Sequence, residues 1–249
     1  MNVLDRFRLE GKVALVTGGS GLVGRQVVEA LVEAGAKVLT ASRNPSTGEH
    51  SGITTFQFDQ GDAKSIDHLA EQVIRHAGAV DILVNNAVLR PMKDWDDPAE
   101  DFAASMRVNA TGLFLVLRAF GNHMAERERG SIINIGSIQG SVGPDYSLYE
   151  ALGWGTPPDY FVHKGGMMQL TRFAAAKLGP RGVRVNCVSP GGVFNNQDAT
   201  FVKRYNARTF LGRMAGATDL QGAIVFLASD ASAYVTGANI PVDGGYTAK

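Results

Sequence analysis

Strand-like and helix-like segments alternate along the whole 249-residue chain, and this alternation constrains the fold more than any other feature. Short β-branched runs occupy residues 12–18, 36–42, 53–58, 80–86, 130–136, 183–189 and 239–243. Longer amphipathic stretches lie between many of them, at residues 24–34, 64–78, 98–126 and 159–178. A strand, a helix and a parallel strand form a right-handed crossover unit. Repetition of that unit predicts one α/β domain over residues 1–249, with a doubly wound parallel sheet of about seven strands and helices on both faces.

The composition argues against several classes of partner. Hydrophobic residues make up 45% of the chain and charged residues 19%, which suits one sizeable buried core. Lys plus Arg (24) balance Asp plus Glu (24), so no excess positive charge favours nucleic acid, and the longest apolar runs are too short to span a membrane. The N-terminus lacks a signal-peptide core, and the single cysteine, Cys187, permits no intrachain disulfide. We therefore expect a cytoplasmic protein that binds neither nucleic acid nor membrane.

A glycine-rich turn follows the first predicted strand. In TGGSGLVGR, Gly18, Gly21 and Gly24 come between Thr17 and a predicted helix. Glycine permits a tight turn and lets a phosphate approach the backbone where no Cβ intervenes. The N–H groups and the dipole of the helix then favour a pyrophosphate, which predicts dinucleotide binding at this turn.

Four motifs together resemble the short-chain dehydrogenase/reductase family over essentially the whole chain. They are VTGG at the start, NNA at residues 85–87, a Ser, Tyr and Lys downstream, and VTGANIPVDGG near the end. The resemblance is to the compact branch of the family, and it implies a Rossmann fold and a nicotinamide-dependent oxidoreductase. The glycine spacing TGxxGxxG departs from that branch, because Leu22 takes the place of its second glycine, and is instead similar to the longer branch that contains epimerases.

The end of the second predicted strand indicates which dinucleotide binds. An acidic side chain there holds the 2′-hydroxyl of NAD, whereas a cation favours the 2′-phosphate of NADP. The strand ends in Ser42 and Arg43 with no carboxylate, so NADP(H) is the preferred cofactor and NAD(H) the alternative. The resemblance extends the cofactor contacts to Gly18, Ser20, Gly21, Leu22, Val23, Gly24, Asp59, Gln60, Asn86, Ala87, Tyr160, Lys164, Val193 and Asn195.

Spacing to a lysine separates the three tyrosines between residues 137 and 164. A tyrosine transfers a proton near neutral pH only where its pKa, about 10 when free, is lowered, and a lysine one helical turn away favours the phenolate. Tyr160 has Lys164 at that distance, whereas Tyr146 and Tyr149 have no such lysine. Tyr160 is therefore the predicted general acid/base on the substrate oxygen.

The remaining site assignments come from the resemblance. It implies that Ser137 hydrogen-bonds the substrate oxygen beside Tyr160, and that Asn109 supports a proton relay near the lysine at a helix irregularity. His163 is about 100° round the predicted helix from Lys164, and we expect it to face away from the site. No clustered acidic or cysteine side chain accompanies a histidine, so no metal is assigned.

Two segments are expected to border the substrate. The long step from Ser137 to Tyr160 requires a looped-out insert of about ten residues if the two side chains are to meet. We expect this insert, residues 145–156, to project over the mouth of the site and shape substrate choice. Residues 195–213 are expected to form a lid, with a solvated amphipathic helix as the alternative. Candidates for lining an apolar pocket are Trp95, Trp154, Tyr146 and Phe194.

Three functions follow from these patterns. The preferred one is an NADP(H)-dependent oxidoreductase that interconverts a secondary alcohol and a ketone. A non-catalytic dinucleotide-binding or sensing module and a sugar-nucleotide epimerase or dehydratase are the alternatives. YEALGWGTPPDY and SPGGVFNNQ further resemble a sub-branch found with bacterial surface-sugar (nonulosonic acid) biosynthesis, which implies a polyhydroxylated small-molecule substrate. The family commonly assembles through the Tyr/Lys helix, its neighbour and the C-terminal strand, so a homotetramer or homodimer is expected.

Overall fold

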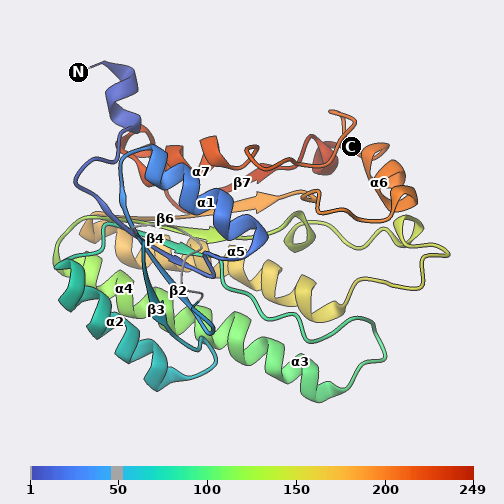
Figure 1. Cartoon of the computed structure of the whole chain (residues 1–249), viewed down its shortest axis with the longest axis horizontal. Coiled ribbons are helices and arrows are strands. Elements are labelled where there is room, and N and C mark those ends of the chain that lie inside the picture. Colours follow the sequence, from blue (N-terminus) through green and yellow to red (C-terminus); the bar gives the residue numbers. More distant parts are fainter. Residues whose placement is uncertain (1, 46–52) are drawn as a thin grey trace.

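A seven-stranded sheet runs through the centre of the computed structural model, which describes residues 2–45 and 53–249 (Figure 1). The strands are β1 (Val13–Thr17), β2 (Lys37–Ser42), β3 (Thr54–Gln57), β4 (Ile82–Asn85), β5 (Gly130–Ile135), β6 (Val183–Pro190) and β7 (Asn239–Val242). Their order is β3-β2-β1-β4-β5-β6-β7, and every neighbouring pair is parallel. The predicted doubly wound parallel sheet is confirmed.

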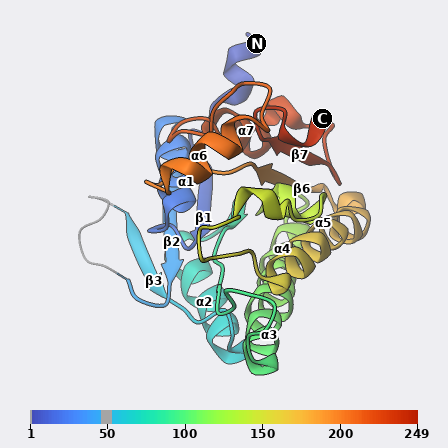
Figure 2. The ribbon, with the colours of Figure 1, turned by 90° about the vertical axis from the view of Figure 1, so that its right-hand side faces the viewer.

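Helices cover both faces of the sheet, as the end-on view shows (Figure 2). They are α1 (Leu22–Glu33), α2 (Ala63–Ala77), α3 (Ala99–Met106), α4 (Leu113–Glu126), α5 (Pro158–Leu178), α6 (Ala199–Asn206) and α7 (Gln221–Ala228). The buried side chains of α1 and α7 share one apolar cluster with the sheet, and those of α2, α4 and α5 share another. The molecule therefore has three layers, with a separate apolar core on each side of the strands.

The central strands alternate between these two cores. In β1, Leu15 belongs to the cluster of α2, α4 and α5, whereas Ala14 and Val16 belong to the cluster of α1 and α7. In β4, Leu83 and its neighbour Val84 divide in the same way. Because successive side chains of a strand point to opposite faces, a strand covered on both sides is apolar along its length, which is the pattern of VALVT and ILVN up to their polar last residues.

The predicted helical stretch 98–126 is continuous but not uniform. It consists of α3, a π-helical segment at Arg107–Gly112, and α4. A Cβ at Gly112 would collide with the backbone of Gln60, so glycine lets this segment approach the residues that follow β3. The irregularity that the family resemblance implied at Asn109 is therefore present.

Helix α7 was not among the predicted segments. Its sequence, QGAIVFLA, is apolar almost all round, so it carries no amphipathic period that would separate a helix from a buried strand. Helix α6 lies within residues 195–213, for which the sequence allowed either a lid or an amphipathic helix.

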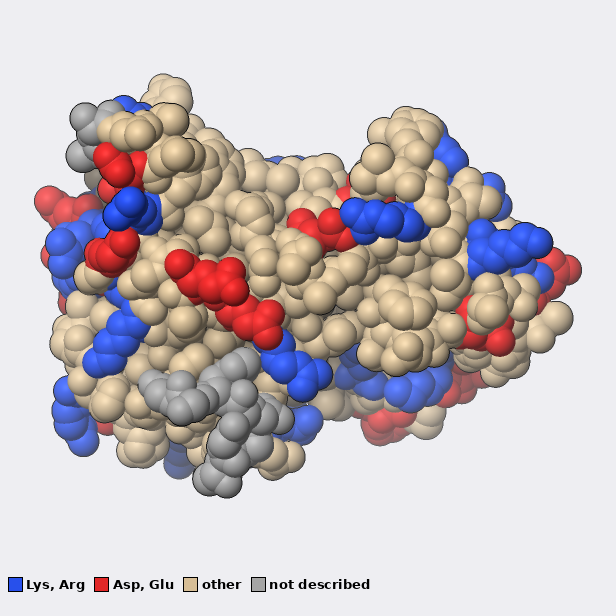
Figure 3. All heavy atoms as spheres, turned by 45° about the horizontal axis from the view of Figure 1, so that its top comes forward, with Lys and Arg blue, Asp and Glu red and all other residues tan. Residues whose placement is uncertain are grey.

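The strand order turns back between β1 and β4, and in open parallel sheets this switch point opens a crevice at the carboxyl ends of the strands. Acidic and basic side chains are interspersed on the face drawn in Figure 3, in keeping with the balanced charge of the chain. Within residues 2–45 and 53–249, no helix is both long enough and apolar enough to cross a bilayer.

Candidate active site

The glycine-rich turn leads from β1 directly into α1 and leaves the helix N-terminus open. Gly21 is the N-cap residue and makes no side-chain capping bond. Gly18 has a φ of 66°, which favours glycine, and a Cβ there would lie 2.9 Å from the Cα of Ala87. A Cβ at Gly24 would collide with the carbonyl oxygen of Gly18. This turn therefore has the uncapped N–H groups and the close backbone approach that a pyrophosphate needs.

Asn86 fastens the turn to the end of β4. Its side-chain amide donates to the carbonyl oxygens of Thr17 at 3.1 Å and Gly18 at 2.8 Å. The backbone N–H groups of Asn86 and Ala87 donate in turn to the Thr17 hydroxyl. Hydrogen bonds of the Thr17 and Asn86 side chains therefore hold the carboxyl ends of β1 and β4 together at the switch point.

A cavity of about 670 Å³ opens at this edge of the sheet and extends from the glycine turn toward α6. Most of the predicted site residues line it: Gly18, Ser20, Gly21, Leu22, Val23, Gly24, Asn86, Ala87, Ser137, Tyr160, Lys164, Val193 and Asn195. Val88, which follows NNA in the sequence, also lines it. Four strand ends and the N-termini of two helices therefore converge on one cavity.

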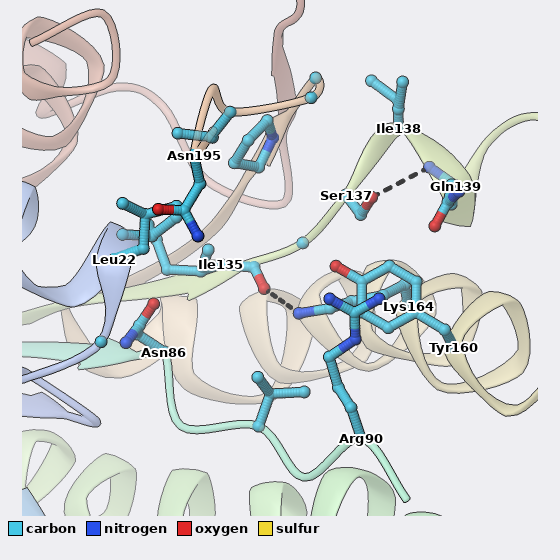
Figure 4. Close-up of a pocket in the computed structure, with 18 of the residues that line it drawn as sticks. Leu22, Asn86, Arg90, Ile135, Ser137, Ile138, Gln139, Tyr160, Lys164 and Asn195 are labelled. Carbon is cyan, nitrogen blue, oxygen red and sulfur yellow. Dashed lines mark hydrogen bonds between the residues drawn. The ribbon is translucent and has the colours of Figure 1, made fainter. Parts of the chain in front are cut away.

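Tyr160 and Lys164 lie one turn apart near the start of α5, which begins at Pro158. The Lys164 ammonium donates to the carbonyl oxygen of Ile135 at 2.5 Å and lies 5.6 Å from the centre of the Tyr160 ring (Figure 4). The Tyr160 hydroxyl is turned toward Ser137, which lies two residues beyond the end of β5. The Ser137 hydroxyl accepts the N–H of Gln139 at 3.2 Å, which orients its oxygen.

Lys164 is buried, with 4% of its surface exposed. Burial lowers its pKa, Arg90 lowers it further, and Tyr160 and Cys187 raise it. Burial therefore makes the ammonium of Lys164 costly, and a negative charge beside it would offset part of that cost.

Asn109 holds the segment that follows β4. Its side-chain oxygen accepts the N–H of Leu89 at 2.9 Å, and its amide donates to the carbonyl of Leu89 at 2.6 Å and to Ser105 at 3.0 Å. Asn109 does not line the cavity. Its side chain therefore fixes backbone geometry, and its support of a proton relay stays a prediction.

The residues predicted to contact the far end of the dinucleotide lie outside that cavity. Arg43 and Asp59 are exposed and line a separate hollow of about 600 Å³ beside α2. Ser42, which ends β2, lines neither cavity. Gln60 is buried, and its amide donates to the carbonyl of Val108 at 2.9 Å, so its side chain serves the packing of the π-helical segment.

The insert contributes aromatic side chains to the main cavity. Tyr149 and Trp154 line it, and their rings pack edge to face with centroids 5.1 Å apart. Phe201 of α6 lies 5.0 Å from the Trp154 ring and also lines the cavity. Insert and α6 therefore form one aromatic wall opposite the glycine turn. Of the four aromatic candidates named from the sequence, Trp154 lines the cavity, and Trp95, Tyr146 and Phe194 do not.

His163 lies outside the cavity lining but is not exposed to solvent. It is buried, and its ring packs edge to face against Tyr160, with centroids 5.1 Å apart. Burial, with smaller effects from Lys164 and Arg90, lowers its pKa to about 3, so its imidazole is neutral. Across the described residues, no three His, Cys, Asp or Glu side chains gather as metal ligands would.

The sequence reasoning missed Arg90, whose guanidinium lies over the Tyr160 ring at 4.9 Å from its centre (Figure 4). Arg90 comes four residues after Asn86, just beyond the carboxyl end of β4. That position was the available signal, because side chains beyond the strand ends reach the crevice.

Comparison with known proteins agrees with this geometry. A family model described as Enoyl-(Acyl carrier protein) reductase matches residues 20–247. A D-threitol dehydrogenase from Mycolicibacterium smegmatis is 34% identical, with 98% of this chain and 95% of the relative covered. A short chain dehydrogenase from Leptospira borgpetersenii, solved with bound NAD+, is 33% identical with a TM-score of 0.89, covering 99% of this chain and 96% of that one.

A gluconate 5-dehydrogenase from Burkholderia cenocepacia, solved with NADP and tartrate, is 32% identical with a TM-score of 0.88, and both chains are covered in full (100%). The family match and these relatives span nearly the whole chain, and the relatives' names denote dehydrogenases. The sub-branch associated with surface-sugar biosynthesis is not among the relatives described. The chain therefore belongs to the short-chain dehydrogenase/reductase family of oxidoreductases.

Proposed function

We propose that the protein is an NADP(H)-dependent oxidoreductase that interconverts a secondary alcohol and a ketone, with Tyr160 as general acid/base. The observation that carries the proposal is the arrangement on α5. Lys164 is anchored on the Ile135 carbonyl beside the Tyr160 ring, and both residues line the cavity that also contains Ser137.

Each of the three side chains has a distinct task. When bound, the nicotinamide cofactor supplies or accepts the hydride. In the direction of carbonyl reduction, Tyr160 donates its hydroxyl proton to the substrate oxygen, and Lys164 stabilises the phenolate that remains. Ser137 donates a hydrogen bond to the same oxygen and orients it toward Tyr160. In the oxidative direction the Tyr160 phenolate takes the proton back.

Residues of this chain supply a cofactor site that fits a dinucleotide. The pyrophosphate would lie on the uncapped N-terminus of α1, at the glycine-rich turn that Asn86 holds by hydrogen bonds. Val193 and Asn195 line the same cavity, with Asn195 beside Leu22 (Figure 4), and they would contact the nicotinamide. Arg43 supports the preference for NADP(H), because its guanidinium is exposed just past the end of β2.

The substrate would be a small molecule with several hydroxyl groups. The relatives named above include a D-threitol dehydrogenase and a gluconate 5-dehydrogenase, both named for polyhydroxylated compounds. In this chain the insert 145–156 and the lid 195–213 would close over such a substrate, because Trp154 and Phe201 pack together at the cavity wall.

We also propose assembly into a homodimer or homotetramer through α5 and α4. Val162 and Phe173 of α5 are 51% and 67% exposed, and Phe114 of α4 is 39% exposed. Apolar side chains grouped on a helix face are typical of protein interfaces.

The function is tested by replacing Tyr160 in a reduction assay. With NADPH and a panel of small hydroxyketones, Tyr160→Phe should lower kcat by roughly 10²–10⁴-fold, because only the proton donor is removed. Tyr146→Phe, at an exposed position outside the cavity, is the control and should keep full activity. Full turnover by Tyr160→Phe would defeat the proposal.

A further inference from the structure

Arg90 brings an unpaired positive charge to the cavity. Its guanidinium stacks over the Tyr160 ring at 4.9 Å from the ring centre. In the described part of the chain, no carboxylate forms an ion pair with it and no oxygen accepts a hydrogen bond from it. The N–H donors of this planar guanidinium are therefore available to a ligand.

The backbone around Arg90 is held from both sides. The preceding residue, Leu89, exchanges two hydrogen bonds with the buried side chain of Asn109. Two residues later, Met92 is buried with 4% of its surface exposed. The segment that carries Arg90 is thus fixed between two anchors, so the position of its guanidinium is set by the fold and not only by its own flexible side chain.

Arg90 also dominates the charge of the cavity. Among the described residues that line the cavity, the charged side chains are Arg90 and Lys164, and no Asp or Glu lines it. Lys164 is committed to the Ile135 carbonyl beside Tyr160. One uncommitted cation with no acidic neighbour in the lining makes the cavity attractive to an anionic group, although the chain as a whole has no net charge.

The guanidinium is on the substrate side of Tyr160. The glycine turn and Asn86 lie across the cavity from Arg90 (Figure 4). The charge of Arg90 also acts on Tyr149, a residue of the insert, and lowers the pKa of its phenol against the larger opposing effect of burial. Arg90 therefore lies beside Tyr160, on the side of the cavity away from the helix N-terminus that would take the pyrophosphate.

We propose that Arg90 determines substrate specificity by binding a carboxylate of the substrate, so that the substrate class is a small hydroxy acid or keto acid. This inference rests on the proposed function, whose substrate it names more narrowly. The planar guanidinium matches a carboxylate with two parallel hydrogen bonds. A carboxylate held over the Tyr160 ring would place the neighbouring hydroxyl or carbonyl carbon near the Tyr160 hydroxyl.

A carboxylate suits the site better than a phosphate. A phosphate monoester carries nearly two negative charges at neutral pH, whereas Arg90 offers one positive charge and the other cation is already committed. The aromatic side chains Tyr149 and Trp154 that complete this end of the cavity add no further charge.

Calorimetric titration with matched pairs of polyol and aldonic acid tests the proposal. The pairs are glycerol with glycerate, threitol with threonate, and galactitol with galactonate. Glycerol 3-phosphate is titrated as well, for comparison of a phosphate with the carboxylate of glycerate. Titrations are made with and without NADPH, which cannot oxidise any of these alcohols. Arg90→Met removes the charge, and Arg90→Lys retains the charge without the paired N–H donors of the guanidinium. Arg75→Met is the control at an exposed arginine on α2.

The wild-type protein should bind at least one acid about tenfold more tightly than its polyol, which is modest for a charge-assisted pair because Arg90 is exposed. Arg90→Met should abolish this preference, Arg90→Lys should retain part of it, and Arg75→Met all of it. No preference for any acid, equal weakening of acid and polyol by Arg90→Met, or tighter binding of glycerol 3-phosphate than glycerate would overturn the proposal. Tyr160→Phe distinguishes a failure of the proposed function from a failure of the Arg90 proposal. This variant should lose turnover and keep the preference for the acid.

Discussion

At the scale of single residues, Arg43 is the proposed determinant of the choice between NADP(H) and NAD(H). Its exposed guanidinium follows Ser42 at the end of β2, and none of the described residues 42–45 is acidic. Arg43→Ala should raise the KM for NADPH by about tenfold and leave the KM for NADH unchanged, because only the 2′-phosphate is lost as a partner. Steady-state assays with both cofactors measure this, with Arg75→Ala as the control. An equal effect on both cofactors would contradict the assignment.

His163 links the active-site helix to the pH dependence of stability. Its pKa is about 3 in the folded protein against 6.5 for free histidine, so the unfolded state binds more protons between these values. Stability contributed by neutral His163 is therefore complete above pH 6.5 and is lost as the pH falls. Urea unfolding at pH 6.5 and 4.5 should show that the wild type loses roughly 2 kcal/mol more than His163→Phe, which keeps the ring contact with Tyr160. Parallel losses in the two proteins would show that His163 does not titrate on unfolding.

At the scale of elements, two arginines tie the insert to α6. Arg204 donates to the carbonyl oxygens of Leu148 at 3.3 Å and Glu150 at 2.7 Å. Arg208, just beyond α6, pairs with Asp145 at 2.9 Å. These contacts hold the aromatic wall of the cavity together, so the insert and the lid should move as one unit.

Loosening this connection should weaken substrate binding selectively. Arg204→Met removes both hydrogen bonds to the insert and should raise the substrate KM by roughly three- to tenfold, while the KM for NADPH stays the same. Lys203→Met, at an exposed position of the same helix, is the matched control. A KM for substrate that does not change would mean that the insert keeps its place without Arg204.

Sequence alone predicted most of the elements, because the central strands of this sheet are buried on both faces and most strands are followed by glycine or a polar residue. The run at 80–86 became β4 at Ile82–Asn85, and Pro158 begins the helix that carries Tyr160. Helix α7 was missed because a helix that is apolar all round shows no period. Arg90 was missed because the direction of its side chain depends on the hold of Asn109 on Leu89, a contact between segments 20 residues apart.

At the scale of the whole molecule, the apolar side chains on α5 point to self-assembly. Phe173→Glu places a charge on the exposed face that Val162 shares, and it should convert the proposed dimer or tetramer into a smaller species. Size-exclusion chromatography with light scattering measures the mass directly. A wild-type protein that is already monomeric would refute the proposed interface.

The whole site works only if one cavity serves both hydride and proton transfer. The structure brings Ser137, Tyr160 and Lys164 to the cavity that also receives the glycine turn and α1. An enzyme built in this way changes its cofactor in every turnover, whereas an epimerase returns the cofactor unchanged and a binding module leaves it untouched. The fate of the hydride therefore separates the three functions.

Deuterium transfer from NADPH labelled at C4 of the nicotinamide tests this account most directly. Mass spectrometry of the alcohol product should find one deuterium on the carbinol carbon for each cofactor oxidised by the wild type. Tyr160→Phe should bind NADPH normally and form the labelled alcohol roughly 10²–10⁴-fold more slowly. An unlabelled product, a cofactor that is not consumed, or labelling at the wild-type rate by Tyr160→Phe would contradict the account.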